Sequence, residues 1–366
     1  MNKYLQDYLI SPETGDALIL TDISENALLY GQLKGNDPVD IFNIVNEIPI
    51  LLKHNQVADY NYNILDIILK DRTNEICNEI LEKHNGNHEL VKEELDKYIL
   101  YEYGKEGIVK AFEEYSIMPE DQKLLWYAKL DKGQENDDNS QIPLSTLNDG
   151  ISYATSENGK KRVEMTEEMI SKWACHLMDY GRLVTDNKSG VIVELATGSG
   201  FGTCGVINSG LGNSKLISID IDYAAAANAI GIAKYLRQEE YIDSLVANFW
   251  FIPLKKGSID VVCSHYGLDE AREINRILVE ISRILKVGGK FINVSRKDPT
   301  IRIRQTFSNI QFSEEEYIKL ASYAGFYCGM EALKKEAEKN KLILEYHNVY
   351  SPKHSHERII SVFKKK

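Results

Sequence analysis

The chain has 366 residues, 43% of them hydrophobic and 27% charged, so it is long enough for two or more folded domains and has an ordinary globular composition. Its formal net charge of −12 is uneven, because residues 1–150 carry −16 and residues 151–366 carry +4. An acidic front half repels phosphate backbones, which disfavours a nucleic-acid partner and favours a small-molecule or peptide substrate. The start, MNKYLQDYLISPETG, lacks the apolar run of a signal peptide, and no stretch is apolar enough to span a membrane, so we expect a cytoplasmic protein.

The five cysteines are an odd number, lie far apart and form no CxxC pair. This pattern argues against a disulfide framework and against a cysteine zinc site, so no metal is expected. They are Cys77, Cys175, Cys204, Cys263 and Cys328. Nothing in the sequence fixes the oligomeric state.

Residues 1–55 read as a small β-rich module, with short apolar runs at 17–20, 27–30 and 48–52 separated by turn residues. Residues 56–130 have apolar side chains at helical spacing and predict a helical segment. Residues 131–163 are rich in Asp, Asn, Ser and Gly, which indicates a linker or a mobile flap.

From residue 164 to residue 366 the sequence alternates strand and helix patterns. A helix is expected from Thr166 to about Tyr180, and the glycine pair at 288–289 is expected to end a later helix. Strands are expected at 191–196, 215–221, 244–247, 259–264, 290–294, 341–349 and 358–363. This alternation predicts the α/β class, with a doubly wound, mostly parallel sheet and helices on both faces.

The segment VIVELATGSGFG, residues 191–202, reads as a buried strand that enters a glycine-rich turn and then a helix. Gly198 and Gly200 would let the backbone approach a ligand, and the helix N-terminus favours an anionic group. A glycine-rich turn alone is shared by dinucleotide enzymes, P-loops and plain tight turns. With Glu194 and Ala196 before it, however, the segment resembles motif I of class I S-adenosylmethionine-dependent methyltransferases, although that family usually has glycine where Ala196 stands.

Two later strand ends extend the resemblance. Asp220 ends the strand LISID, where a carboxylate can accept both ribose hydroxyls, although Asp222 is close enough to compete for the role. Asn248 stands where the family has an Asp that bonds the adenine amino group, and its amide oxygen can still accept that bond. The resemblance implies a donor site made of Glu194, Ala196, Thr197, Gly198, Ser199, Gly200, Asp220, Ile221, Asn248, Phe249 and His265.

Residues 257–267 and 280–294 resemble the family's fourth strand and its "helix, lysine, proline, glycine-glycine, strand" block, so the resemblance covers about residues 165–366. It implies a Rossmann-like fold and in-line transfer of a methyl group from a sulfonium to a nucleophile. His265 and Tyr266 are the catalytic candidates, His265 as a general base, with a pocket-lining role as the alternative. Aromatic residues that would line an acceptor pocket, or belong to the core, are Tyr153, Trp173, Tyr223 and Trp250.

The absence of an Asn/Asp-Pro-Pro-Tyr or Pro-Cys element after the fourth strand argues against adenine N6 or cytosine C5 methylation. The paired histidines at 84 and 88 read as a helix-helix turn, and those at 354 and 356 as solvated side chains. Residues 1–53 resemble the zinc-ribbon-like activator proteins of tRNA and protein methyltransferases, but Ser11 stands at the cysteine position. We therefore interpret this part as a metal-free docking module or a stability element.

Four functional hypotheses follow. The first is methyl transfer from S-adenosylmethionine to a small molecule or peptide. The second is the same enzyme with an RNA substrate. The third is a catalytically inactive binding or scaffold protein, suggested by Ala196 and Asn248, and the fourth is an NAD-binding protein, because such enzymes also place an acid after the second strand.

Overall fold

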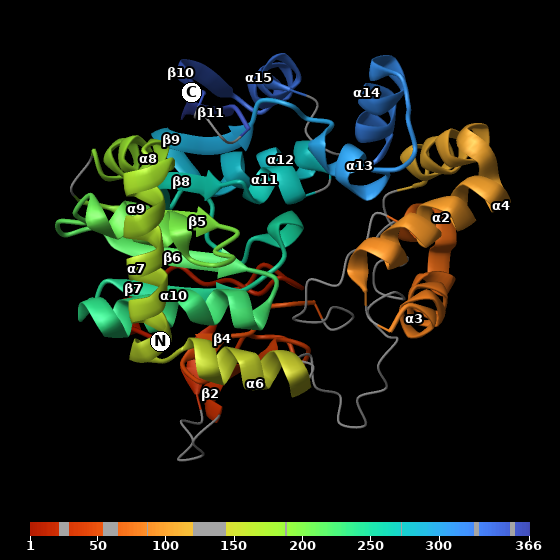
Figure 1. Cartoon of the computed structure of the whole chain (residues 1–366). Coiled ribbons are helices and arrows are strands. Elements are labelled where there is room, and N and C mark those ends of the chain that lie inside the picture. The colour runs from red at the N-terminus through yellow and green to blue at the C-terminus, as the bar shows by residue number, and fades with distance from the viewer. Residues whose placement is uncertain are drawn as a thin grey trace. The chain divides into compact units, whose positions relative to one another are not determined.

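The structure is a computed structural model that describes residues 1–21, 29–53, 65–85, 87–119, 144–186, 189–271, 273–325, 329–351 and 356–366. The chain forms two compact units (Figure 1). Met1–Tyr60, Gln134–Lys297 and Lys334–Lys366 make the first unit, and Asn61–Gly133 with Asp298–Leu333 make the second. Among the helices of the described residues, none is both long and apolar enough to cross a bilayer.

A seven-stranded sheet forms the centre of the first unit, with strand order β10-β11-β9-β8-β5-β6-β7. The five strands from β9 to β7 are parallel, whereas β11 and β10 run antiparallel at one edge. The strands are β5 (Val191–Leu195), β6 (Lys215–Asp220), β7 (Ile242–Val246), β8 (Ile259–His265), β9 (Leu285–Arg296), β10 (Leu342–Tyr350) and β11 (Arg358–Lys365). Every residue of β5, β6 from its second residue, and β7 is buried, as expected for parallel strands covered on both faces. The predicted α/β class with a mostly parallel sheet is confirmed.

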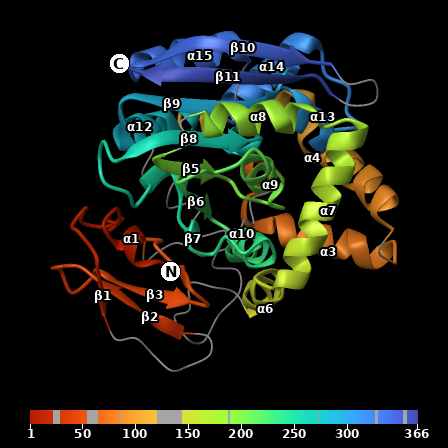
Figure 2. The same ribbon diagram turned by 90° about the vertical axis from the view of Figure 1, so that its left-hand side faces the viewer.

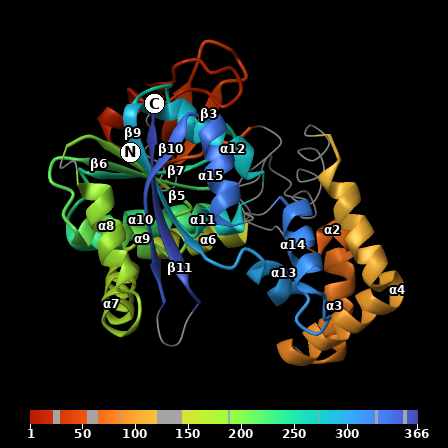
Figure 3. The same cartoon turned by 90° about the horizontal axis from the view of Figure 1, so that it is seen from above.

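Helices cover the two faces of this sheet (Figure 3). On one face, apolar side chains of α8, α9 and α10 form a common core with the strands, and α7 packs on α9 and α10. On the other face lie α12 and α15. The helices of this unit are α1 (Lys3–Gln6), α6 (Leu144–Tyr153), α7 (Ser156–Lys172), α8 (His176–Thr185), α9 (Phe201–Asn208), α10 (Tyr223–Leu236), η2 (Phe249–Phe251), α11 (Gly267–Glu270), α12 (Ile274–Ile284) and α15 (Met330–Lys339), the last of which begins in the second unit.

The N-terminal module is a four-stranded antiparallel sheet, which agrees with the β-rich module predicted from the sequence (Figure 2). Its strands are β1 (Ile19–Thr21), β2 (Leu29–Lys34), β3 (Ile41–Val45) and β4 (Ile48–Pro49). Its first turn is closed by hydrogen bonds at the position where the activator proteins have a cysteine. The buried Ser11 hydroxyl donates to Asp40 and accepts from the Glu13 and Thr14 N–H groups at 3.0 and 3.1 Å, and Thr14 Oγ1 donates to Asp40 at 2.6 Å. The resemblance of this module to activator proteins stays a prediction.

This module lies against the β7 edge of the large sheet. Ile50 bridges Val246 in parallel, and the Leu51 N–H donates to the Val246 carbonyl at 2.8 Å. The apolar residues of β4 and of the segment after it share a core with Val246 and α10: Ile48, Ile50, Leu52, Ala154, Tyr223, Ala226, Ala227, Ile230 and Val246. The module therefore covers the edge of the sheet with both backbone and apolar contacts.

Several elements differ from the sequence-based expectation. Residues 144–153 and 156–163, expected to be part of a linker or flap, are helical. Helix α7 begins at Ser156, with Thr155 as its cap, instead of at Thr166. The expected helix from 166 to 180 is broken between Lys172 and His176. Residues 131–143, the rest of the expected linker or flap, lie outside the described residues, and for them it stays a prediction.

The glycine pair at 288–289 lies inside β9, not at the end of a helix, because α12 already ends at Ile284. Gly288 has φ 81°, and the pairing of β8 with β9 shifts register between Ile259 and Val261. A strand tolerates such an irregularity where glycine supplies the backbone freedom.

The second unit is helical, with α2 (Asp66–Leu69), η1 (Lys70–Arg72), α3 (Thr73–Lys83), α4 (His88–Ser116), α13 (Ile301–Thr306) and α14 (Glu314–Tyr323). Residues that lie some 200 positions apart share one apolar core, since Ile99, Ile108 and Phe112 of α4 belong to the same cluster as Phe307 and Leu320. The segment 298–333, which the sequence assigned to the 164–366 domain, thus belongs to this helical unit.

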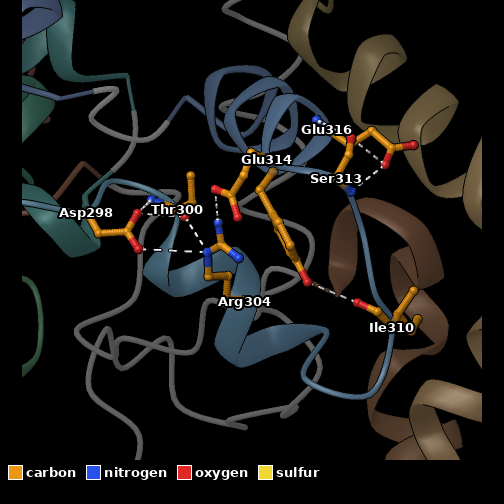
Figure 4. A network of polar contacts seen from close by, with 8 residues as sticks. Asp298, Thr300, Arg304, Ile310, Ser313, Glu314 and Glu316 are labelled. Atoms are coloured by element: carbon orange, nitrogen blue, oxygen red, sulfur yellow. Dashed lines mark hydrogen bonds and ion pairs between the residues drawn. The ribbon is translucent and has the colours of Figure 1, made fainter.

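Arg304 contacts several residues of the segment 298–333 (Figure 4). Its Nε donates to Thr300 Oγ1 at 2.7 Å, and its guanidinium lies 4.0 Å from the ring centroid of Tyr317, whose hydroxyl donates to the Ile310 carbonyl at 3.1 Å. Ser313 and Glu316 form a capping box that starts α14. These contacts fix α13 relative to α14 within the unit.

Candidate donor site at the carboxyl ends of the strands

The turn after β5 has three residues with left-handed backbone conformations. Ala196, Gly198 and Gly200 have φ values of 63°, 50° and 80°. Glycine adopts such values freely, whereas the alanine is strained by roughly 1–2 kcal/mol. A Cβ on Gly267 would lie 2.4 Å from the Ala196 methyl, so the glycine at the start of α11 leaves the space that this methyl occupies. The substitution at the usual glycine position is therefore accommodated by a second glycine, and Gly198 and Ser199 are the exposed part of the turn.

The structure separates the two acids that compete in the sequence. Asp222 caps α10, because its Oδ1 accepts from the Ala224 and Ala225 N–H groups at 2.7 and 3.1 Å. Asp220 instead faces the glycine turn, where its Oδ2 accepts from the Gly198 N–H at 2.9 Å and its Oδ1 from the Asp222 N–H at 3.0 Å. Burial raises the pKa of Asp220 to about 6, although the two backbone N–H bonds oppose the shift. Asp220 is thus an oriented carboxylate with lone pairs left for a hydroxyl donor.

Glu194 is a buried carboxylate with one oxygen left over. Its Oε2 accepts from Thr203 Oγ1 at 2.5 Å and from Ser218 Oγ at 2.8 Å, while Oε1 has no hydrogen-bond partner among the described residues. A Cβ on Gly202 would lie 2.4 Å from Oε1, so glycine at this position leaves the space that this buried oxygen occupies. Burial raises the pKa of Glu194 to about 7. The Oγ1 of Thr197, in the adjacent turn, is buried and without a partner among the same residues.

Asn248 begins the short helix η2 after β7. Its Oδ1 accepts from the Trp250 N–H at 2.9 Å, and the neighbouring Ala247 N–H donates to the Asp220 carbonyl at 2.9 Å. The oxygen that the sequence assigns to adenine therefore already holds one backbone bond and retains one lone pair. Phe249 and Ile221, the other predicted contacts, are half-buried at the same strand ends.

His265 contacts a histidine that the sequence did not single out. Its Nε2 lies 3.1 Å from Nε2 of His176 on α8, and the two rings stack with centroids 5.4 Å apart. Burial, the neighbouring His176 and the cationic Arg358 hold the pKa of His265 well below its usual value, and burial lowers the pKa of His176 to about 4. Both imidazoles are therefore neutral near pH 7, one donating to the other. Such a ring is a weak base, and the catalytic role of His265 stays a prediction.

Tyr266 is the left-handed N-cap of α11, and Arg358 donates to its hydroxyl. The hydroxyl also lies 3.5 Å from His176 Nε2, at the limit of a hydrogen bond. The sequence pattern did not predict that α8 and β11 contact the residues at the end of β8. The contacts arise only from the fold, because the partners lie some 90 positions apart.

The four aromatic candidates for an acceptor pocket do not form one group. Tyr223 is fully buried in the core that the N-terminal module shares with α10, and Tyr153 packs against the same core. Trp173 packs on the α8 side with the Arg358 guanidinium 4.9 Å from its ring centroid, and Trp250 lies in η2. No group of three or more His, Cys, Asp or Glu suited to a metal occurs in the described part of the chain.

Residues 193–293, from Glu194 and its glycine turn to β9, match the family model described as "Methyltransferase domain". This part of the chain is therefore a methyltransferase domain. A curated relative, the demethylmenaquinone methyltransferase of Lactococcus lactis subsp. lactis strain IL1403, is 34% identical over 120 residues, which are 32% of this chain and 46% of that protein. The match thus covers less than half the length of the relative.

Solved structures with similar chains include the geranyl diphosphate C-methyltransferase of Streptomyces coelicolor A3(2), determined with Mg²⁺, geranyl diphosphate and S-adenosyl-L-homocysteine. Its sequence identity is 14% and its TM-score 0.39, with 51% of this chain and 79% of that one covered. The complex of the Haloferax volcanii Trm112 methyltransferase activator with a methyltransferase matches at 14% identity and TM-score 0.41, covering 55% and 93%. The predicted methyltransferase domain is confirmed by the family match of residues 193–293.

Proposed function

We propose that this chain binds S-adenosylmethionine at the carboxyl ends of β5, β6 and β7 and transfers its methyl group to a small-molecule or peptide acceptor. The observation that carries the proposal is the buried, partnerless Oε1 of Glu194, which sits beside a glycine turn and an oriented Asp220. A buried carboxylate oxygen without a donor costs free energy unless a ligand supplies one. The amino group of the donor is such a ligand.

The residues present fit the parts of the donor. The Asp220 carboxylate would accept hydroxyls of the ribose, and Glu194 Oε1 would accept from the amino group. The exposed backbone of Gly198 and Ser199 allows close approach, and Asn248 with Phe249 lies at the end of β7, where the base would be held. When bound, S-adenosylmethionine supplies a methyl group on a positively charged sulfur.

The residues of the chain then have to position the acceptor relative to the donor. Holding the acceptor nucleophile in line with the methyl group converts an encounter of two molecules into a reaction within one complex. His265 at the end of β8 and His176 on α8 are neutral, so they add no positive charge to that of the nearby Arg358. A protein base is needed only where the acceptor must lose a proton.

A small acceptor is supported by two observations. Residues 1–150 carry a net charge of −16, which opposes RNA binding. The relative from Lactococcus lactis bears the name of an enzyme for demethylmenaquinone, a small molecule. A peptide remains compatible with the same charge.

Calorimetry with S-adenosylmethionine and S-adenosylhomocysteine tests the donor site, with NAD as the competing ligand. We expect both adenosyl compounds to bind and NAD to give no heat. If neither adenosyl compound binds to the folded protein, the chain is an inactive methyltransferase-like protein. Tighter binding of NAD would replace the proposal with a dinucleotide site.

The acceptor class is tested with donor labelled in its methyl group and a cell extract fractionated by size. Label in compounds below about 1 kDa or in short peptides supports the proposal, since these have the size of a single pocket. Label recovered in RNA, and lost on ribonuclease treatment, would assign an RNA substrate instead.

A further inference from the structure

The glycine turn of the donor site is held from α10 as well as from β6. Asn228 of α10 is 3% exposed, and its Nδ2 donates to the Gly198 carbonyl at 2.7 Å. Because Asp220 accepts from the Gly198 N–H at 2.9 Å, both polar groups of this glycine have side-chain partners. The exposed part of the turn is therefore fixed by two buried side chains.

Asn228 also forms a hydrogen bond with a residue at the start of α7. Its Oδ1 accepts from Asn158 Nδ2 at 3.0 Å, and the same Nδ2 donates to the Tyr153 carbonyl at the end of α6 at 3.1 Å. Asn158 also lies in the first turn of α7, where its N–H donates to the Thr155 side chain at 3.2 Å. Three hydrogen bonds thus connect the α6–α7 turn, residues 153–158, with Gly198 through Asn228.

Close backbone packing makes this connection stiff. A Cβ on Gly159 would lie 1.9 Å from the Gly231 carbonyl oxygen, and a Cβ on Gly231 would lie 2.2 Å from the Tyr153 carbonyl oxygen. Helix α10 packs against both α6 and α7 (Figures 1 and 2). At such contact distances, the α6–α7 turn cannot move away from α10 without breaking the bonds of Asn158.

We propose that Asn228 is a positioning residue that couples the α6–α7 turn to the donor site, so that donor binding at the glycine turn and the order of residues 153–158 strengthen each other. The proposal rests on the proposed function. By linkage, whatever fixes Gly198 lowers the conformational freedom of Asn228 and of the turn that it holds, and the reverse is equally true. The donor thereby stabilises the conformation of the segment that precedes the methyltransferase motifs.

Two variants separate the two halves of the connection. Asn158→Ala removes the outer bonds and leaves the Asn228 contact with Gly198 in place. Asn228→Asp keeps an oxygen for Asn158 but places a second oxygen against the Gly198 carbonyl, where the native amide donates. Asn213→Asp, at an exposed position in the loop before β6, is the matched control.

Hydrogen exchange of residues 153–158, read by mass spectrometry with and without saturating S-adenosylhomocysteine, is the experiment. In the wild type and in Asn213→Asp, we expect the ligand to slow exchange of this turn about fivefold or more, the lower range of measured coupling between sites. In Asn158→Ala the ligand still binds, within about threefold of the wild-type affinity, but no longer slows exchange there. In Asn228→Asp the affinity itself falls about tenfold, because the glycine turn loses a partner.

The outcomes distinguish this proposal from the proposed function. Binding in calorimetry without protection of the turn in the wild type overturns the coupling alone. Equal protection in Asn158→Ala also overturns it, because the turn then responds without its link. A wild-type protein that binds no S-adenosylhomocysteine overturns both. Circular dichroism verifies that each variant is folded, and Asn158→Ala decides the matter even where Asn228→Asp does not fold.

Discussion

Replacing Glu194 by glutamine tests the central electrostatic feature of the donor site. The wild-type carboxyl is 1% exposed, and its pKa is raised from 4.5 to about 7, chiefly by burial. Glutamine has the same shape and stays neutral at every pH. Its amide oxygen can accept from Thr203 and Ser218 as Oε2 does.

The sign of the effect follows from proton linkage. An acid whose folded-state pKa is raised contributes stability that is fully present below its unfolded pKa and lost as the pH rises through its folded pKa. For Glu194 the window runs from about pH 4.5 to about pH 7. At about 1.4 kcal/mol per pKa unit, the shift corresponds to roughly 3 kcal/mol, of which about 2 to 3 kcal/mol falls between pH 5 and pH 8.

Urea unfolding of the donor-free protein at pH 5 and pH 8, followed by circular dichroism, measures this difference. The free energy of unfolding of Glu194→Gln minus that of the wild type should be about 2 to 3 kcal/mol larger at pH 8 than at pH 5. Glu239→Gln, at an exposed site, is the control and should leave the pH dependence unchanged. An identical pH dependence in Glu194→Gln and the wild type would refute the reasoning, since the carboxyl would then ionise normally.

Three further predictions concern other parts of the domain. Asp220→Ala should weaken binding of S-adenosylhomocysteine about 10- to 150-fold in calorimetry, the equivalent of losing charge-assisted bonds of roughly 1.5 to 3 kcal/mol, and unchanged affinity would remove Asp220 from the site. In NMR spectra of the imidazole rings, His265 should still be neutral at pH 6.5, because burial and the neighbouring His176 lower its pKa, and His176 should titrate near pH 4; a transition of either ring near pH 6.5 would contradict their burial. Gly159→Ala should lower the free energy of unfolding by about 1 to 3 kcal/mol through overpacking against Gly231, whereas Lys160→Ala, on the exposed side of the same helix, should not; equal urea midpoints for the two variants would show that α7 and α10 can separate.

Most of the sheet could be predicted from the sequence, because parallel strands buried on both faces leave short, continuous apolar runs. The strands VIVEL and LISID are such runs, and each is followed by a helix with regular spacing. The helix α7 was placed too late because its first turns, Ser156 to Lys161, are polar and contain Gly159. The packing of that glycine on α10 and the Thr155 cap favour a helix there.

The candidate donor residues could be proposed as a set, since a motif fixes their order along the chain. What the sequence did not show was how each oxygen is used. Asp220 and Asp222 differ by two positions and look alike until one is seen to cap α10. Asn248 similarly appears as a free acceptor in the sequence, whereas its oxygen bonds the Trp250 backbone.

Long-range contacts account for the rest. His176 was not singled out because its partner His265 lies 89 positions later and no sequence motif contains both residues. In the same way, residues 298–333 carry helical spacing but no local indication that they join α4 instead of the sheet that surrounds them in sequence. Hydrophobic periodicity identifies a helix but does not identify its neighbour.

The pairing of Leu51 with Val246 has a consequence for how the N-terminal module stays in place. The contact is made within one polypeptide, so its effective concentration is on the order of millimolar, far above that of a separate protein in a cell. A weak interface is then sufficient, and substitutions in it would loosen the module without releasing it. A methyltransferase domain produced without residues 1–53 would instead present the open edge of β7 and the apolar side of α10 to other molecules, and unpaired strand edges of this kind promote aggregation.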